Sequence, residues 1–476
     1  LERSTMVGMF GRVAYNYKQK YFLSVTLRRD ASSKFGENTR WGTFPSYAIA
    51  YTFSEEPYMD WARDFLDFGK IRLSYGKSGK QFEYPYFAFG VLIVNNIPFH
   101  GNQTITPYWP NGLINPKLSW EETKQFDAGL DLEFFGNRLS LELDYYYRYT
   151  DKLLAQVTLP GDYNAYTAQW QNAYAISNQG IELQIKADLI RSEKLHWDFS
   201  FNIARNWNRF EKSNNGMDFT NLASKHNLNI IGKPLNGIYV YNDEGYYNSQ
   251  DEVPLYYVNG RRKYLSSLGN QIYSPGDRRI QDVDGNGQVA TMVPLLEDRV
   301  YGGSPLPLAF GGIASTLKWK GIDVNLLFSY KLGRHVLNAG RGASVGTILR
   351  ANTAEMMVPI LADLDKVSFW QKPGDNTDFP INELENGKNN FATNLKSNVE
   401  KINYLKLKSI SIGYILPVFP KQSKHYARVF MSVENVFTIT NSSSPDPESI
   451  DIVTGVDSNN NYPLATRFTL GLTLNL

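Results

Sequence analysis

The sequence predicts an all-β fold, a transmembrane antiparallel β-barrel to which this chain contributes about thirteen strands. Three observations lead to this prediction. Apolar and polar residues alternate with a period of two over many segments, short and long connections take turns between the segments, and tyrosine and phenylalanine gather at the segment ends. Each segment is close to the ~9–11 residues that a tilted membrane strand needs.

The alternation is clearest over residues 322–331, where Ile322, Val324 and Leu326 share one face and mostly polar residues take the other. A strand with two unlike faces gives this pattern, because successive side chains point to opposite sides. The thirteen predicted strands span residues 5–17, 20–30, 47–53, 68–76, 122–134, 139–151, 176–189, 195–210, 309–319, 322–332, 402–415, 426–438 and 467–476.

The connections distinguish a membrane barrel from a soluble β-sandwich or propeller. Short or modest connections lie at 18–20, 135–138, 190–194, 320–321 and 416–424. Long ones lie at 31–46, 77–121, 152–175, 211–308, 333–401 and 439–466. Residues 54–67 are intermediate, and we expect a short helical turn there. Short periplasmic turns opposite long extracellular loops are typical of outer-membrane barrels, whereas the sequence lacks the ~40–50-residue repeat of a propeller.

Aromatic residues at strand ends, such as Tyr15, Tyr51, Tyr145 and Tyr147, favour the same fold. Amphipathic rings prefer the boundary between membrane and water, so we interpret these residues as interfacial girdles. Ordinary packing of aromatic side chains in a core is the alternative.

The strand count also predicts how the chain is placed. If the long loops lie outside the cell, the last strand ends at the periplasm and residue 1 lies at the cell surface. A closed bacterial barrel has an even number of strands and no open edge in lipid. We therefore expect the rest of the barrel to come from a preceding segment or from another chain. Residues 1–4, LERS, resemble neither an initiator sequence nor a signal peptide, so we expect a processed or partial chain.

Composition and motifs argue against several functional classes. Lys+Arg is 49 and Asp+Glu is 47, so no net field favours nucleic acid. The chain has no cysteine, which excludes thiolate catalysis, Cys-based metal sites and disulfides. No apolar run approaches the ~20 residues of a spanning helix. The five histidines lack metalloprotease spacing, and no G-x-S-x-G, Walker or Rossmann pattern occurs in a strand–helix setting. We expect that the chain is not an enzyme.

Several short motifs follow one another in order from residue 11 to the C-terminus. They are GRVAYNY (11–17), KYFL (20–23), RDASSKF (29–35), RWGTFPS (40–46), RLSYG (72–76), LSWEET (118–123), NQGIE (178–182), PGD (275–277), YLKLK (404–408), ENVF (434–437) and DPE (446–448). Together they resemble SusC/RagA-type TonB-dependent transporters. Several motifs in order are far more specific than any one of them.

The resemblance implies a 22-stranded barrel with a plugged lumen in the bacterial outer membrane. Residues 1–476 would then be the C-terminal portion of that barrel, with the plug and the early strands outside this chain. It further implies import of oligosaccharides or oligopeptides, a SusD-like surface lipoprotein as partner, and energy from TonB through a missing N-terminal segment. The remaining contacts would be the rest of the barrel, the plug, membrane lipid and lipopolysaccharide. The alternation alone leaves open a passive porin or structural barrel, or a surface enzyme or adhesin.

Residues 282–288, DVDGNGQ, match the front half of an EF-hand calcium loop. Position 12 of that loop is Val293 instead of an acid, so Glu297 or Asp298 would have to replace it. One expectation is an extracellular loop ordered by Ca²⁺. The other is an ion-free turn rich in Asp, Asn and Gly. The predicted ligands are Asp282, Asp284, Asn286, Gln288 and Asp298.

Aromatic residues inside the long loops are candidates for substrate contact, since sugar rings and peptide side chains both stack on such surfaces. Packing of the loops against one another is the alternative. The predicted contact residues are Phe99, Tyr108, Trp109, Tyr166 and Trp170, with Tyr256 and Tyr257 as further candidates.

Overall fold

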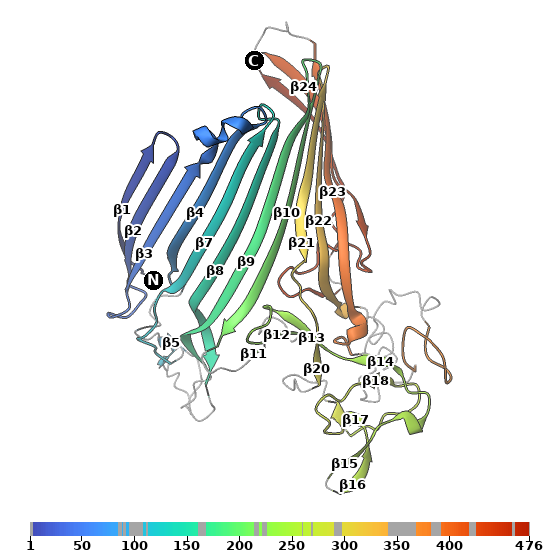
Figure 1. The fold of residues 1–476 in the computed structure, drawn as a ribbon. Helices are drawn as coiled ribbons and strands as arrows, with labels where there is room; N and C mark the ends of the chain where they lie inside the picture. The colour runs from blue at the N-terminus through green and yellow to red at the C-terminus, as the bar shows by residue number, and fades with distance from the viewer. Residues whose placement is uncertain are drawn as a thin grey trace, which may run out of the picture.

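The computed structural model describes residues 3–83, 88, 92–94, 108–110, 113–159, 168–213, 219–220, 226–258, 260–267, 270–289, 298–340, 368–381, 392–417, 425–458 and 462–475. Thirteen strands follow one another in a single antiparallel sheet that curves into a tall open wall (Figure 1). Short turns connect the strands at one end of the wall, and the long loops gather at the other. The prediction of an antiparallel barrel wall of thirteen strands is therefore confirmed.

The strands of the wall lie in chain order. They are β1 (Met6–Tyr17), β2 (Tyr21–Ser32), β3 (Trp41–Thr52), β4 (Leu66–Lys80), β7 (Glu121–Phe134), β8 (Leu139–Thr158), β9 (Ala168–Arg191), β10 (Leu195–Lys212), β21 (Ala309–Trp319), β22 (Ile322–Asn338), β23 (Val399–Leu416), β24 (Tyr426–Thr440) and β26 (Arg467–Asn475).

Several strands continue further into the loop end than the alternation predicts. The predicted loop 31–46 is wrong in its bounds, because β2 runs to Ser32 and β3 begins at Trp41. β22 likewise runs to Asn338, and β23 begins at Val399. Consecutive residues are buried there, since loops cover the strand on both sides, and burial on both faces removes the period of two.

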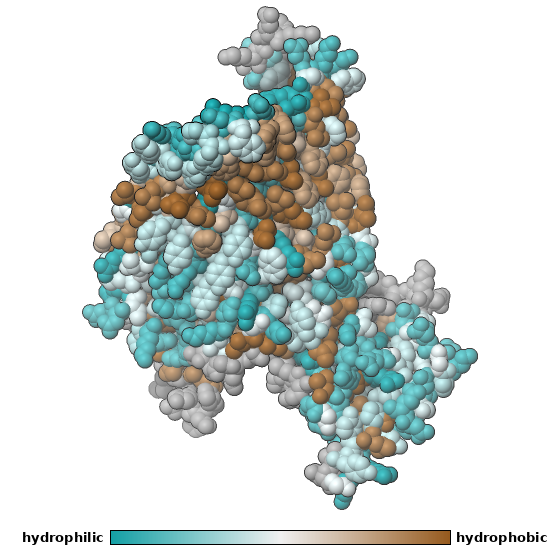
Figure 2. All heavy atoms as spheres, viewed as in Figure 1, coloured by the Kyte–Doolittle hydropathy of each residue, from teal (hydrophilic) through white to brown (hydrophobic). Residues whose placement is uncertain are grey.

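The two faces of the wall differ in chemistry. On β4, Ile71, Leu73 and Tyr75 are exposed on the outer face, whereas Arg72 and Ser74 lie on the inner face. Figure 2 shows hydrophobic residues gathered over the strands towards the short-turn end, with hydrophilic residues at the turns themselves. An outer apolar face and a polar interior are what a membrane barrel requires. No helix in the described part of the chain is long and apolar enough to cross a membrane.

Side chains on the inner face cross neighbouring strands where a glycine makes room. Arg428 of β24 passes over Gly413 of β23 and donates two hydrogen bonds, of 2.8 and 2.6 Å, to Asp323 of β22. A side chain at position 413 would collide with the Arg428 guanidinium. Similar crossings join β4 to β8 and β8 to β10: Arg72–Asp144 over Gly129, and Tyr146–Asn206 over Gly180.

The connections carry most of the remaining structure. The helical turn predicted within 54–67 is present as η1 (Phe53–Glu55) and η2 (Pro57–Ala62). The loop end holds small sheets and turns: β5 (Leu92–Val94) with β6 (Tyr108–Pro110); β11 (Phe219–Thr220), β12 (Asn227–Asn229), β13 (Gly237–Tyr241) and β20 (Arg299–Gly303); β14 (Asp243–Tyr246) with β18 (Arg278–Ile280); β15 (Leu255–Val258) with β16 (Arg261–Tyr264); β17 (Ser266–Ser267) with β19 (Gln288–Val289); η3 (Gln250–Glu252) and η5 (Lys396–Asn398).

The two faces of β22 offer a direct test of the membrane assignment. We expect Leu326→Arg to lower the free energy of unfolding by about 2–4 kcal/mol, because this face meets lipid near mid-depth. Leu327→Arg is the matched control, since the neighbouring residue lies on the inner face with Asn325 and Ser329 and should cost little. Urea unfolding of the intact barrel in lipid vesicles measures both, and equal losses would contradict the assignment of faces.

Candidate functional site

The loop end of the wall is the part of the structure in which charged and aromatic side chains come together. Three features there bear on function: an ion network that holds the last loop, an acidic turn around Asp282, and aromatic side chains of the long loops. Outer-membrane barrels carry their long loops on the extracellular side, so we refer to this end as extracellular and to the short-turn end as periplasmic.

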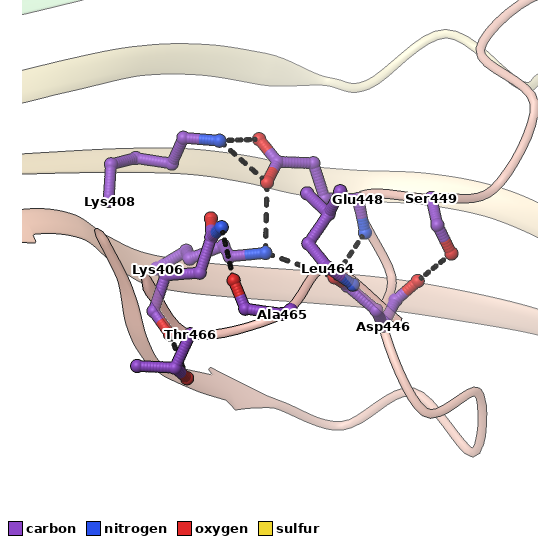
Figure 3. A network of polar contacts seen from close by, with 9 residues as sticks. Lys406, Lys408, Asp446, Glu448, Ser449, Leu464, Ala465 and Thr466 are labelled. Atoms are coloured by element: carbon purple, nitrogen blue, oxygen red, sulfur yellow. Dashed lines mark hydrogen bonds and ion pairs between the residues drawn. The ribbon is translucent and has the colours of Figure 1, made fainter. Parts of the chain in front are cut away.

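The ion network joins β23 to the loop between β24 and β26 (Figure 3). The Lys406 side chain is only 3% exposed, and its ammonium lies 3.0 Å from an oxygen of Asp446 and 3.0 Å from one of Glu448. Lys408 donates to both oxygens of Glu448, at 2.9 and 2.8 Å. Asp446 also accepts hydrogen bonds from the backbone N–H groups of Glu448 and Leu464. The network therefore fixes two separate parts of one loop to the wall.

The two carboxylates of this network are held in the charged form. Burial by itself would raise the pKa of Asp446, but hydrogen bonds from the Glu448 N–H and the Lys406 ammonium outweigh it and lower the pKa. Burial also opposes ionisation of Glu448, and hydrogen bonds from Lys408 and Lys406 again lower its pKa. The loop attachment therefore depends on ionised carboxylates.

A second set of contacts anchors the same loop to β22. The Arg334 side chain, 1% exposed, donates hydrogen bonds to the backbone carbonyls of Pro305, Ile450 and Asp451. The short strand β25 (Val456–Asp457) pairs in parallel with the end of β22. Three of the five guanidinium N–H donors thus find carbonyl acceptors, which offsets part of the cost of burying the charge. The last loop is thus a fixed part of the wall.

The structure brings together three of the five predicted calcium ligands. Carboxylate oxygens of Asp282, Asp284 and Asp298 all lie within 4.8 Å of one another. Asp298 is buried, and one of its oxygens accepts a hydrogen bond of 2.9 Å from the Val283 N–H. Asp298 therefore stands where the acid of position 12 would be expected, although it lies much further along the chain.

The other two predicted ligands support the turn itself. The Asn286 side-chain oxygen Oδ1 accepts a hydrogen bond of 2.7 Å from the Gln288 backbone N–H, and the Asn286 side-chain nitrogen Nδ2 donates to Asp284 at 2.7 Å. The Gln288 amide nitrogen donates to Asn270 at 2.8 Å. Burial, and then the nearby charge of Asp282, raise the pKa of Tyr256 to about 12. Glu297 and Val293 lie outside the described residues.

The predicted aromatic contact residues have different surroundings. Trp170 packs with its ring 4.9 Å from that of Phe82, beside a buried cluster that contains Trp120 and Phe44. Tyr108 and Trp109 lie in the short strand β6, and Phe99 and Tyr166 lie outside the described residues.

The two further aromatic candidates also differ. Tyr256 packs against the largest buried cluster of the loops. Tyr257 is 70% exposed and stands beside Arg262, which donates to its hydroxyl at 2.9 Å. Packing thus accounts for Trp170 and Tyr256, whereas the exposed Tyr257 ring is open to a ligand.

Sequence reasoning did not find the anchoring roles of Arg334, Lys406 and Lys408. A signal was present, because YLKLK places two lysines on the inner face of a strand and DPE supplies two acids in the facing loop. Alternation reports which face a lysine occupies but cannot report which loop covers that face.

The fold and the loop geometry define an outer-membrane β-barrel wall with ordered extracellular loops. The chain matches the family described as TonB dependent receptor-like, beta-barrel, over residues 2–339. It therefore belongs to this family of the bacterial outer membrane, which confirms the predicted resemblance and location.

Known relatives agree with this assignment. TonB-dependent receptor P3 of Formosa agariphila is 30% identical over 100% of this chain and 46% of its own length. TonB-dependent receptor SusC of Bacteroides thetaiotaomicron is 27% identical over 99% of this chain and 44% of its own length. The chain thus spans about half the length of these relatives. In fold it is similar to the RagAB peptide transporter, with a TM-score of 0.75 at 22% identity, covering 99% of this chain and 48% of that one.

Acidification should release the last loop. Because the pKa values of Asp446 and Glu448 are lowered on folding, their contribution is fully present above the unfolded values near 4 and is lost as pH falls below them. We expect proteolysis within residues 441–466 to accelerate below about pH 4. At neutral pH, Lys406→Met should weaken the attachment by about 3–5 kcal/mol, since it leaves the buried Asp446 carboxylate without its cation.

Lys408→Met is the matched control for this prediction. Its side chain is 31% exposed and it shares Glu448 with Lys406, so its loss should cost about 1 kcal/mol or less. Equal proteolysis rates for the two variants would contradict the assigned role of Lys406.

Proposed function

We propose that this chain is part of a TonB-dependent importer of the outer membrane, which takes up oligosaccharides or oligopeptides. Membership of the TonB-dependent receptor family carries the proposal. The polar inner face of the wall supports it, because a lumen lined by Arg72, Asp131 and Asp144 suits hydrophilic cargo. The ordered extracellular loops support it as well, since fixed loops can present a binding surface at the mouth of the barrel.

The partners in this proposal lie beyond the thirteen strands. The outer edges of β1 and β26 have no neighbouring strand among the described residues, and unpaired backbone groups are costly in lipid. We propose that further strands and a plug complete the barrel, that TonB supplies energy from the periplasm, and that a SusD-like lipoprotein sits on the extracellular loops. The relative named SusC and the similar fold of the RagAB peptide transporter support these partners. They leave both cargo classes open.

Uptake by cells that express the complete gene tests the proposal. We expect uptake of a fluorescent oligopeptide or maltooligosaccharide that stops when TonB is deleted. A porin would give uptake that is independent of TonB, together with steady ion conductance of the purified protein in planar bilayers. Either of those results would overturn the importer proposal.

We also propose that the turn at Asp282 binds Ca²⁺ and that the ion orders the loop around it. The convergence of Asp282, Asp284 and Asp298 supports this, because Ca²⁺ prefers carboxylate and carbonyl oxygens. The ion would offset repulsion between three carboxylates, a structural role distinct from catalysis.

Terbium luminescence tests this calcium proposal, because Tb³⁺ takes calcium sites and Tyr256 stands beside Asp282 as an antenna. We expect saturable emission that Ca²⁺ displaces, and an affinity lowered about tenfold in Asp282→Asn. Asp251→Asn, in the nearby turn η3, is the matched control and should bind as the unmodified protein does. Absence of displaceable emission would leave the ion-free turn as the correct interpretation.

A further inference from the structure

Three aspartates on the inner face of the described wall lie directly opposite a glycine of the neighbouring strand. Since glycine has no side chain, each carboxylate can lie over the backbone of that strand and reach towards the strand beyond it. A side chain from the far strand can then meet the carboxylate above the glycine. The three pairs are Asp323 with Gly413, Asp144 with Gly129, and Asp30 with Gly8.

Two of these carboxylates meet an arginine that comes from the far side of the glycine. The Asp323 carboxylate accepts hydrogen bonds of 2.8 and 2.6 Å from Arg428. The Asp144 Oδ1 lies over Gly129, where a Cβ would collide with it, and Arg72 donates to this oxygen at 3.1 Å. Arg72 is itself the residue paired with Gly129 from the other side. Each of these crossings therefore ties three successive strands together.

Asp30 has the same geometry, but it stands next to the open edge of the wall. Its Oδ1 lies over Gly8, where a Cβ would again collide with it. Because β1 is the edge strand, no described strand lies beyond Gly8. On the β3 side Asp30 is paired with Gly42, and the Phe44 ring already covers that glycine. The carboxylate thus reaches only towards the edge.

The Asp30 carboxylate is satisfied at one oxygen only. The residue is 3% exposed, and its Oδ2 accepts a hydrogen bond of 2.7 Å from the Arg28 Nε. Its Oδ1 is buried, and no donor among the described residues reaches it. A buried carboxylate oxygen without a donor is costly, because it has given up its water without replacement. The missing donor therefore has to come from beyond the edge.

We propose that the strand that pairs with β1 in the complete barrel carries an arginine or lysine, which donates to Asp30 over Gly8. A cation fits because both completed crossings use one, and a charge-assisted hydrogen bond is the stronger kind. Arg428 lies two residues from the position opposite Gly413, so the basic residue stands opposite Gly8 or one inner-face position away. This inference rests on the proposal that further strands complete the barrel, and it names the chemistry of the strand next to β1.

Such a crossing would give Asp30 a positioning role. A slip of one residue between β1 and its neighbour would turn the basic side chain to the outer face, away from the carboxylate. The contact would therefore select one register for the pairing at this edge.

Disulfide scanning of the complete protein, with its own cysteines replaced by serine, tests the pairing. Phe10→Cys occupies the inner-face position next to Gly8, and Phe10 is 78% exposed. Single cysteines along the other strands report which residue stands opposite position 10, and in an antiparallel pair the residue opposite Gly8 lies two positions further along. We expect arginine or lysine there or at the inner-face position on either side. The absence of a basic residue from all three positions overturns the proposal.

A double-mutant cycle then measures the coupling between Asp30 and that basic residue. Asp30→Asn and the change of the basic residue to glutamine should each lower the urea midpoint for unfolding in lipid vesicles. Together they should lower it no further than the larger single loss, because both remove one contact. Asp144→Asn with Arg72→Gln is the matched cycle within the wall. Additive losses at Asp30, beside non-additive losses in the matched cycle, overturn the proposal.

The outcomes separate this inference from the importer proposal. Failure of Phe10→Cys to form a disulfide with any strand overturns the inference together with the completed barrel. A register without a basic residue overturns the inference alone. Uptake that is independent of TonB overturns the importer and leaves the pairing at β1 unaffected.

Discussion

A backbone that crosses lipid must satisfy its N–H and C=O groups within the protein, and this requirement governs the rest of the structure. The strands meet it through a continuous antiparallel ladder from β1 to β26. The ladder fixes the register, and a slip of one residue would turn each side chain to the other face. Register is also what sets Gly413 between Arg428 and Asp323, so an ion pair can reach across a whole strand on the inner face.

The same ladder continues beyond the membrane and becomes a platform for the loops. The extracellular ends of β22 and β23 carry Arg334 and Lys406, two cations that are almost fully buried. Burial of a cation is tolerated only where acceptors surround it, and here one loop supplies carbonyls to the first and carboxylates to the second. The burial of these two cations and the position of the loop therefore depend on each other.

Charged side chains are arranged differently at the two ends of the wall. At the extracellular end, lysines are enclosed and paired within the chain, which gives fixed loops. At the periplasmic end, an ion pair such as Arg428–Asp323 crosses a strand on the inner face and holds no loop. Turn length sets this division, since short turns cannot fold back over the strands they join.

The sequence by itself determined the thirteen strands and their faces, because alternation is a local pattern that lipid on one side and water on the other impose directly. The family came from the resemblance of several motifs in order. The sequence also singled out Asp282, Asp284 and Asp298, with Glu297 as the alternative to Asp298. Only the tertiary structure decided that Asp298 meets the other two acids, that Trp170 packs beside Phe82, and that Lys406 holds the last loop. These contacts join residues far apart in the chain, and burial on both faces erases the alternation exactly where they form.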